Sequence, residues 1–218
     1  MSQTQNRRSF VSSLASLAGL AALEGRASAA QAPARGTAPA AGQWDLTWFD
    51  ALKGAHKQMY DYGTFELSND TRPLRFVKNY LDTYRDVFAL QGADINTAVG
   101  ISRSCFPINA GDALWQKYKI GERWKINDPA TNQPSVRNIF LSDGDLSVKA
   151  MQARGTAFWQ CNVALGAITQ QFAQATGTPV ADVRTDLLAG LNPGVHLVPA
   201  HVMALGIAQE HGFTYMKT

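Results

Sequence analysis

Cys161 is the residue of this 218-residue chain whose position best suits nucleophilic chemistry. It ends an apolar run over residues 156–160, and Asn162 follows as the N-cap of a small-residue helical pattern. Unpaired N–H groups and the helix dipole at a helix start favour the thiolate, which is the reactive form of cysteine. Free cysteine is also among the most buried residue types and packs as a small hydrophobe. From placement alone, both roles stay open for Cys161.

Other polar side chains are predicted at the carboxyl ends of strands, where ligands bind in open parallel sheets. The candidates at these ends, besides Cys161 and Asn162, are Asp61, Tyr62, Arg103, Cys105, Pro199 and His201. A histidine such as His201 can act as a general acid or base, and it can equally be an ordinary polar residue in the first turn of a helix. The sequence shows no partner that would decide between these roles.

Cys105 and Cys161 are the two cysteines of the chain. Neighbouring strands lie about 4.8 Å apart, so the two thiols could form a disulfide if their strands are adjacent and the compartment is oxidising. If the strands are not adjacent, both residues stay thiols.

Common cofactor and metal signatures do not occur in the sequence. The four histidines, at positions 56, 196, 201 and 211, lack metal-site spacing, and no metal is expected. The glycine-rich dinucleotide and phosphate motifs and the G-x-S-x-G elbow are missing, so no cofactor is expected.

Helical and strand patterns alternate along the chain. The clearest helix carries apolar residues three and four positions apart, at Leu74, Val77, Leu81, Tyr84 and Phe88. Strands are predicted at residues 57–62, 96–104, 156–160, 195–198 and 213–217. Further helices are predicted at residues 44–53, 110–118, 145–154, 162–175, 183–191 and 199–209. This alternation favours a single α/β domain with a mostly parallel five-stranded sheet and helices on both faces.

Residues 119–141 have neither a helical nor a strand period. Loops of this length inside a compact domain are often functional. We expect either a surface insertion or a lid that places Trp124 and Phe140 over a pocket.

The first 29 residues resemble an export signal. Arg7 and Arg8 precede a mildly apolar segment, and small residues follow at positions 27–29, as in a twin-arginine signal. The apolar segment is shorter than the roughly 20 residues of a membrane span, so no stable membrane insertion is expected. Residues 30–42 are predicted to be a disordered linker, and residues 43–218 the folded domain. Removing residues 1–29 reduces the net charge from +3 to +1, so nucleic acid is not an expected partner.

Two stretches of the chain resemble a known family. GTAFWQCNVAL and LNPGVHLVPAHVMALGIAQEHGFTYMK are similar to the C-terminal half of DsrE/DsrF-like proteins, in particular exported members with a twin-arginine signal. The central stretch DALWQKYKIGERWKINDPATNQPSVRN also resembles those relatives, and the likeness spans about residues 44–217.

The resemblance implies a parallel five-stranded sheet, assembly into homo-oligomers, and sulfur chemistry at a cysteine. Cys161 is the residue that matches the cysteine in the pattern of the exported members. We therefore expect a periplasmic protein that binds or carries a small sulfur species on Cys161, with Asn162 and His201 orienting or protonating the ligand. The alternative is a non-enzymatic module or oligomeric scaffold that binds a small molecule and uses Cys161 structurally, alone or in a disulfide.

Overall fold

A computed structural model describes residues 44–68 and 72–218 of the protein. The expected signal at residues 1–29 and the expected linker at residues 30–42 lie outside these described residues, so both stay predictions.

The centre of the structure is a five-stranded sheet in which all strands are parallel. The strands are β1 (His56–Tyr62), β2 (Ile95–Ile101), β3 (Thr156–Cys161), β4 (Val195–Val198) and β5 (Thr214–Lys217). Their order across the sheet is β4-β3-β2-β1-β5. The predicted α/β class and the five-stranded parallel sheet are confirmed, and the strand order is new information.

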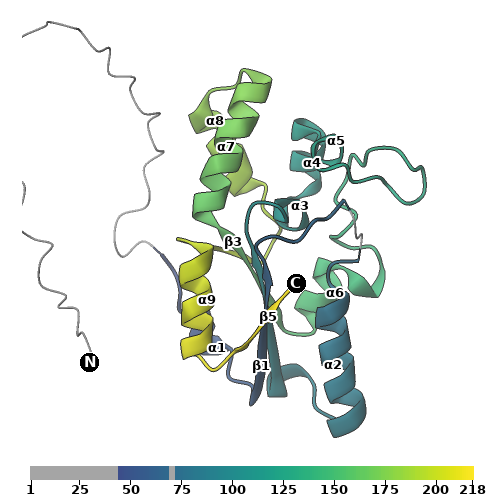
Figure 1. Ribbon diagram of the computed structural model, residues 1–218, viewed down its shortest axis with the longest axis vertical. Helices are drawn as coiled ribbons and strands as arrows, with labels where there is room; N and C mark the ends of the chain where they lie inside the picture. Colours follow the sequence, from purple (N-terminus) through teal and green to yellow (C-terminus); the bar gives the residue numbers. More distant parts are fainter. Residues whose placement is uncertain (1–43, 69–71) are drawn as a thin grey trace, which may run out of the picture. The chain divides into compact units, whose positions relative to one another are not determined.

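Helices pack on both faces of this sheet. The α-helices are α1 (Trp48–Ala51), α2 (Arg75–Phe88), α3 (Phe106–Asn109), α4 (Asp112–Tyr118), α5 (Ile120–Trp124), α6 (Val148–Ala153), α7 (Asn162–Thr176), α8 (Val180–Ala189) and α9 (His201–Glu210). Two short 3-10 helices are η1 (Gly92–Asp94) and η2 (Gly144–Leu146). Figure 1 shows α1 and α9 on one face of the sheet, α2 and α6 on the other, and α7 and α8 beyond the carboxyl ends of the strands.

Alternation along the strands divides the buried side chains between two cores. Tyr60 and Tyr62 of β1 belong to the larger core, which α2, α3, α6 and α7 cover. Met59 of β1 and Trp159 of β3 belong to a smaller core under α1 and α9. Asp61 and Cys161 each lie two residues after Met59 and Trp159 in their strands, so they face the α9 side. Gly100 faces the same side because it pairs in register with Asp61.

Several predicted boundaries differ from the structure. β2 ends at Ile101 rather than at Ser104, because the chain turns at residues 102–105 into α3. The last helix begins at His201 rather than at Pro199, because Ala200 is still extended and serves as its N-cap. In α2, Leu81 is buried, but Phe88 at the end of the predicted stripe is 62% exposed, since the helix extends past the sheet.

Residues 119–141 are more ordered than the pattern predicted. They begin with the short helix α5, and Arg137 pairs with Asp128 at 3.1 Å and with Asp143 at 2.7 Å. Phe140 is buried in the core and is not among the residues that line the pocket at Trp124. Trp124 does line a pocket, with its indole N–H donating to the backbone carbonyl of Ser104 at 2.8 Å. Of the two alternatives for residues 119–141, the lid does not fit Phe140, which packs in the core, whereas Trp124 does line a pocket.

Across residues 44–68 and 72–218, none of the helices has both the length and the apolar character that a membrane crossing requires.

Candidate functional site

Three residues on neighbouring strands form a straight row beneath α9. Asp61 of β1 pairs in register with Gly100 of β2, and Gly100 pairs with Trp159 of β3. All three positions face the same side of the sheet because parallel strands in register keep their alternation aligned. The row therefore has a carboxylate at one end, an indole at the other, and no side chain in the middle.

The imidazole of His201 fills the space above Gly100. Trp159 Nε1 donates a hydrogen bond to His201 Nδ1 at 3.2 Å, and His201 Nε2 lies 2.7 Å from Asp61 Oδ1. An indole N–H can only donate, so Nδ1 must be the acceptor and the ring proton must be on Nε2. His201 Nε2 consequently donates to Asp61, and both ring nitrogens are in use.

Gly100 is required for this arrangement. A Cβ at this position would lie 2.8 Å from His201 Cε1 and would also collide with the Trp159 indole. No side chain other than the hydrogen of glycine fits under the imidazole. The small residue in the middle strand is what lets His201 bridge β1 and β3.

Asp61 accepts hydrogen bonds from three parts of the chain. Besides His201, the backbone N–H of Gly63 donates to Oδ1 at 2.8 Å, and the Tyr215 hydroxyl donates to Oδ2 at 2.7 Å. Burial on its own acts to raise the pKa of Asp61, but the hydrogen bonds from His201, Tyr215 and Gly63 outweigh it, and the pKa is lowered. The carboxylate is thus held in its ionised form.

The Cys161 sulfur accepts two backbone hydrogen bonds. The N–H of Ala164, in the first turn of α7, lies 3.4 Å from Sγ, and the N–H of His201, at the start of α9, lies 3.2 Å away. Cys161, and not Asn162, is therefore the N-cap of α7, with its sulfur as the capping acceptor. Two helix N-termini, each favouring negative charge, meet at this one atom.

Cys161 lies at the wall of a cavity of about 460 Å³, although only 4% of the residue is exposed. The cavity is lined mainly by apolar side chains, together with the charged or titratable Arg103, Cys161 and His201. The lining residues are Ser102, Arg103, Cys161, Val163, Ala164, Ala167, Ala200, His201 and Val202. A small ligand in this cavity would contact the sulfur and the first turns of α7 and α9.

The structure brings together four of the eight candidate residues: Asp61, Arg103, Cys161 and His201. Asp61 is connected to the group through His201, and Arg103 through the shared cavity. Pro199 is not among the cavity-lining residues; it lies in the turn between β4 and α9.

Asn162 also lies apart from this cavity. Its side-chain carbonyl accepts a hydrogen bond from the Arg184 guanidinium of α8. This contact directs Asn162 toward α8, so the expected role in orienting a ligand beside Cys161 does not fit its position.

Cys105 is fully buried at the N-cap of α3, and its thiol donates to the backbone carbonyl of Phe65 at 3.3 Å. Burial raises the pKa of Cys105 to about 12, which keeps it a thiol. Although β2 and β3 are neighbours, Cys105 and Cys161 are both free, because each sulfur faces a different set of backbone groups.

Three residues of the site were not among the sequence candidates: Gly100, Trp159 and Tyr215. Gly100 and Trp159 lie inside strands rather than at their ends, and Tyr215 is on the edge strand β5. A glycine within an otherwise apolar strand is a sequence signal of close approach by another group, and it could have pointed to Gly100. Within the described part of the chain, no group of three or more His, Cys, Asp or Glu residues could hold a metal ion.

Comparisons with known proteins add no functional assignment to the geometry described above. No family model matches the chain, and no curated protein matches it either. The solved structure of a protein of unknown function from Methanobacterium thermoautotrophicum is similar at 16% sequence identity, covering 75% of this chain and 99% of that one, with a TM-score of 0.38.

Proposed function

We propose that this chain is an exported DsrE-like protein that carries a sulfane sulfur on Cys161. One observation carries the proposal: the Cys161 sulfur lines a cavity and accepts hydrogen bonds from two helix N-termini. N–H groups in this position favour negative charge, both on a thiolate and on the terminal sulfur of a persulfide. The resemblance of residues 155–165 and 191–217 to exported DsrE-like sequences supports the same reading.

The loading step needs no oxidant or reductant. The Cys161 thiolate attacks a terminal sulfur of a polysulfide, a new S–S bond forms at Cys161, and the S–S bond that held this terminal sulfur breaks. The polysulfide leaves one sulfur atom shorter and takes up the proton that the thiol released. Cys161 is then a persulfide, and the reverse attack by an acceptor thiolate unloads it.

His201 supports this step through its backbone. Its N–H points at the sulfur, while its ring is held between Trp159 and Asp61. The ring therefore positions the start of α9 and does not exchange a proton with the ligand, which replaces the proton-transfer role expected from the sequence.

Mass spectrometry after treatment with sodium tetrasulfide tests the proposal. We expect Cys161 to gain mass in steps of one sulfur, while the buried Cys105 stays unmodified and serves as an internal control. A Cys161→Ser variant should gain nothing. The proposal fails if Cys161 stays unmodified under conditions that load a free thiol peptide.

The second candidate is a non-enzymatic binding module in which Cys161 only caps α7. The small exposed fraction of Cys161, 4%, favours this alternative. It predicts that Cys161→Ser keeps the ligand bound in the cavity, whereas a carrier loses all sulfur transfer. The periplasmic location and the homo-oligomer stay predictions from residues 1–29 and from the family resemblance; a protease-protection assay on spheroplasts and light scattering would test them.

A further inference from the structure

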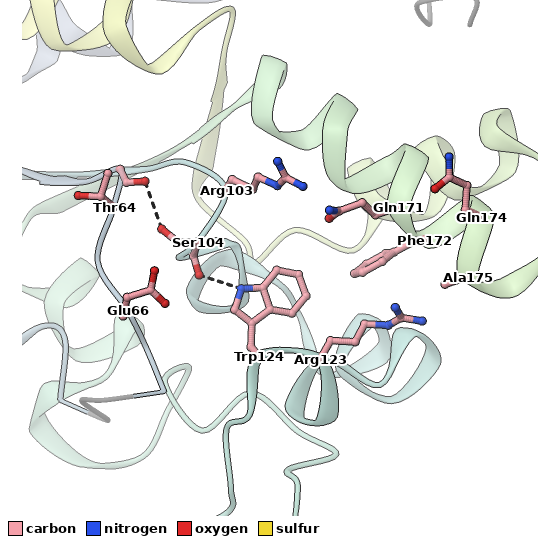
Figure 2. Close-up of a pocket in the computed structure, with 11 residues that line it drawn as sticks. Thr64, Glu66, Arg103, Ser104, Arg123, Trp124, Gln171, Phe172, Gln174 and Ala175 are labelled. Atoms are coloured by element: carbon pink, nitrogen blue, oxygen red, sulfur yellow. Dashed lines mark hydrogen bonds between the residues drawn. The ribbon is translucent and has the colours of Figure 1, made fainter.

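A second and larger cavity shares a lining residue with the one at Cys161. Its volume is about 860 Å³, within the range of pockets that hold whole organic ligands. Arg103 is the residue that lines both cavities. Figure 2 shows this second cavity between the turn that carries Arg103, helix α5 and helix α7.

The charged groups of this cavity are mostly cationic. Arg103 is exposed, and within the described part of the chain its guanidinium has no hydrogen-bond or ion-pair partner. Arg123 of α5 donates from Nε to the Tyr118 carbonyl at 2.7 Å, which leaves both terminal nitrogens without a partner among the described residues. In Figure 2, both guanidinium groups point toward α7 and away from Glu66. Such forked donors match carboxylates and similar anions.

The remaining walls suit a flexible organic molecule. The half-buried Trp124 ring provides apolar surface, and the Arg123 guanidinium lies 5.3 Å from the centre of the buried Phe172 ring, which holds it in place. Gln171 offers an amide that can both donate and accept. Glu66, on the opposite side, is an exposed carboxylate that can pair with an ammonium group.

We infer that the sulfur donor of Cys161 is an amino-acid- or peptide-like thiol persulfide that binds in this second cavity. This inference rests on the proposed function of Cys161. Arg103 and Arg123 bind the carboxylates of the donor, Glu66 pairs with its ammonium, and the sulfur end reaches Cys161 past Arg103. The Cys161 thiolate attacks the terminal sulfur of the donor R–S–SH, the donor S–S bond breaks, and the products are Cys161–S–SH and the thiolate R–S⁻.

Binding of an unreactive probe tests the cavity separately from the chemistry. The probe is S-methylglutathione, which carries two carboxylates, an ammonium group, amide bonds and a blocked sulfur. Isothermal titration calorimetry should show binding to the wild-type protein and to Cys161→Ser. We expect Arg103→Gln and Arg123→Gln each to weaken binding roughly tenfold, the loss of one charge-assisted contact.

Two further variants make the result specific. Lys149→Gln removes an exposed cation outside the cavity and should leave probe binding unchanged. Glu66→Gln should weaken binding of the probe. Tighter binding of the probe by this variant would overturn the pairing of Glu66 with the ammonium group. Absence of binding to the wild type, or equal binding by the arginine variants, overturns the inference.

Loading by tetrasulfide separates this inference from the proposed function. The wild-type protein and Lys149→Gln should load Cys161 from inorganic tetrasulfide at the same rate, since this loading tests the sulfur chemistry without the organic donor. If tetrasulfide loads Cys161 but the probe does not bind, only the donor assignment is wrong. If the probe binds but Cys161 never loads, the carrier function is wrong, and the cavity binds such ligands without passing sulfur to Cys161.

Discussion

His201 Nε2 lies 2.7 Å from Asp61 Oδ1, a contact between residues 140 positions apart in the sequence. It connects the first turn of α9 to the end of β1 across the intervening strand β2. The same α9 turn places the His201 N–H on the Cys161 sulfur. The Asp61–His201 contact therefore fixes one of the two donors that the sulfur accepts.

Gly100→Ala tests the space beneath His201. The added methyl group would displace the imidazole and the Trp159 indole, so we expect the free energy of unfolding to fall by about 1–3 kcal/mol. Chemical denaturation followed by circular dichroism measures this change. Gly166→Ala in α7 is the matched control, because its Cβ meets nothing within 4 Å and should stabilise the helix by about 0.5–1 kcal/mol. Equal stability of Gly100→Ala and the wild type would contradict the packing described here.

Asp61→Asn tests the ionised carboxylate. The pKa of Asp61 in the folded protein is below its ordinary value of 3.8, so ionisation stabilises the fold above that value. This contribution is lost as the pH falls through the lowered pKa. We expect Asp61→Asn to be less stable than the wild type by about 1–3 kcal/mol at pH 7, with the gap narrowing toward pH 3.

Urea denaturation at several pH values measures that gap. Asp94→Asn, at an exposed aspartate, is the control and should follow the wild-type profile. A gap between Asp61→Asn and the wild type that stays constant down to pH 3 would show that the charge is not responsible.

Native alkylation distinguishes the two thiols. Because burial raises the pKa of Cys105 to about 12 and no part of it is exposed, iodoacetamide at pH 8 should leave it unmodified in the folded protein. Cys161, which lines a cavity, should react first, and both should react in denaturant. Peptide mapping after timed quenching gives the order, and earlier labelling of Cys105 would contradict the assigned burial.

Cys161→Ala and Cys161→Ser separate the capping role of the sulfur from its chemistry. Alanine removes the acceptor for the N–H groups of Ala164 and His201, so we expect a loss of about 0.5–2 kcal/mol in unfolding free energy. Serine restores an oxygen acceptor and should recover part of that loss. Thermal denaturation compares the two, and neither variant should take up sulfur; sulfur uptake by either would place the modification elsewhere.

Asn162→Ala tests whether this residue serves the ligand or the fold. Its carbonyl accepts from Arg184, whose buried Nη1 already has no partner among the described residues. Burial lowers the pKa of Arg184. Removing the amide should reduce stability by about 1–3 kcal/mol, while the rate of Cys161 loading by tetrasulfide stays at the wild-type value. A slower loading rate at unchanged stability would show that Asn162 acts on the ligand at Cys161 and not on the fold.

Local patterns account for what the sequence predicted correctly. The apolar runs of β3 and β4 and the spacing of Val77 and Leu81 in α2 depend on neighbours within one element, and those elements are where they were expected. The position of Cys161 between a strand and a helix follows from the same local signals. The exact cap was missed because an asparagine is a commoner N-cap than a cysteine.

The amino-acid sequence by itself determined the alternation of strands and helices, the parallel class of the sheet and the place of Cys161 at a strand end, because these depend on short-range periodicity. Only the tertiary structure decided that Gly100 lies between Asp61 and Trp159, and that His201 spans all three. That arrangement depends on the strand order and on the register between strands far apart in the chain. Neither the strand order nor the register can be read from a local sequence pattern, because strands pair through backbone groups that every residue shares.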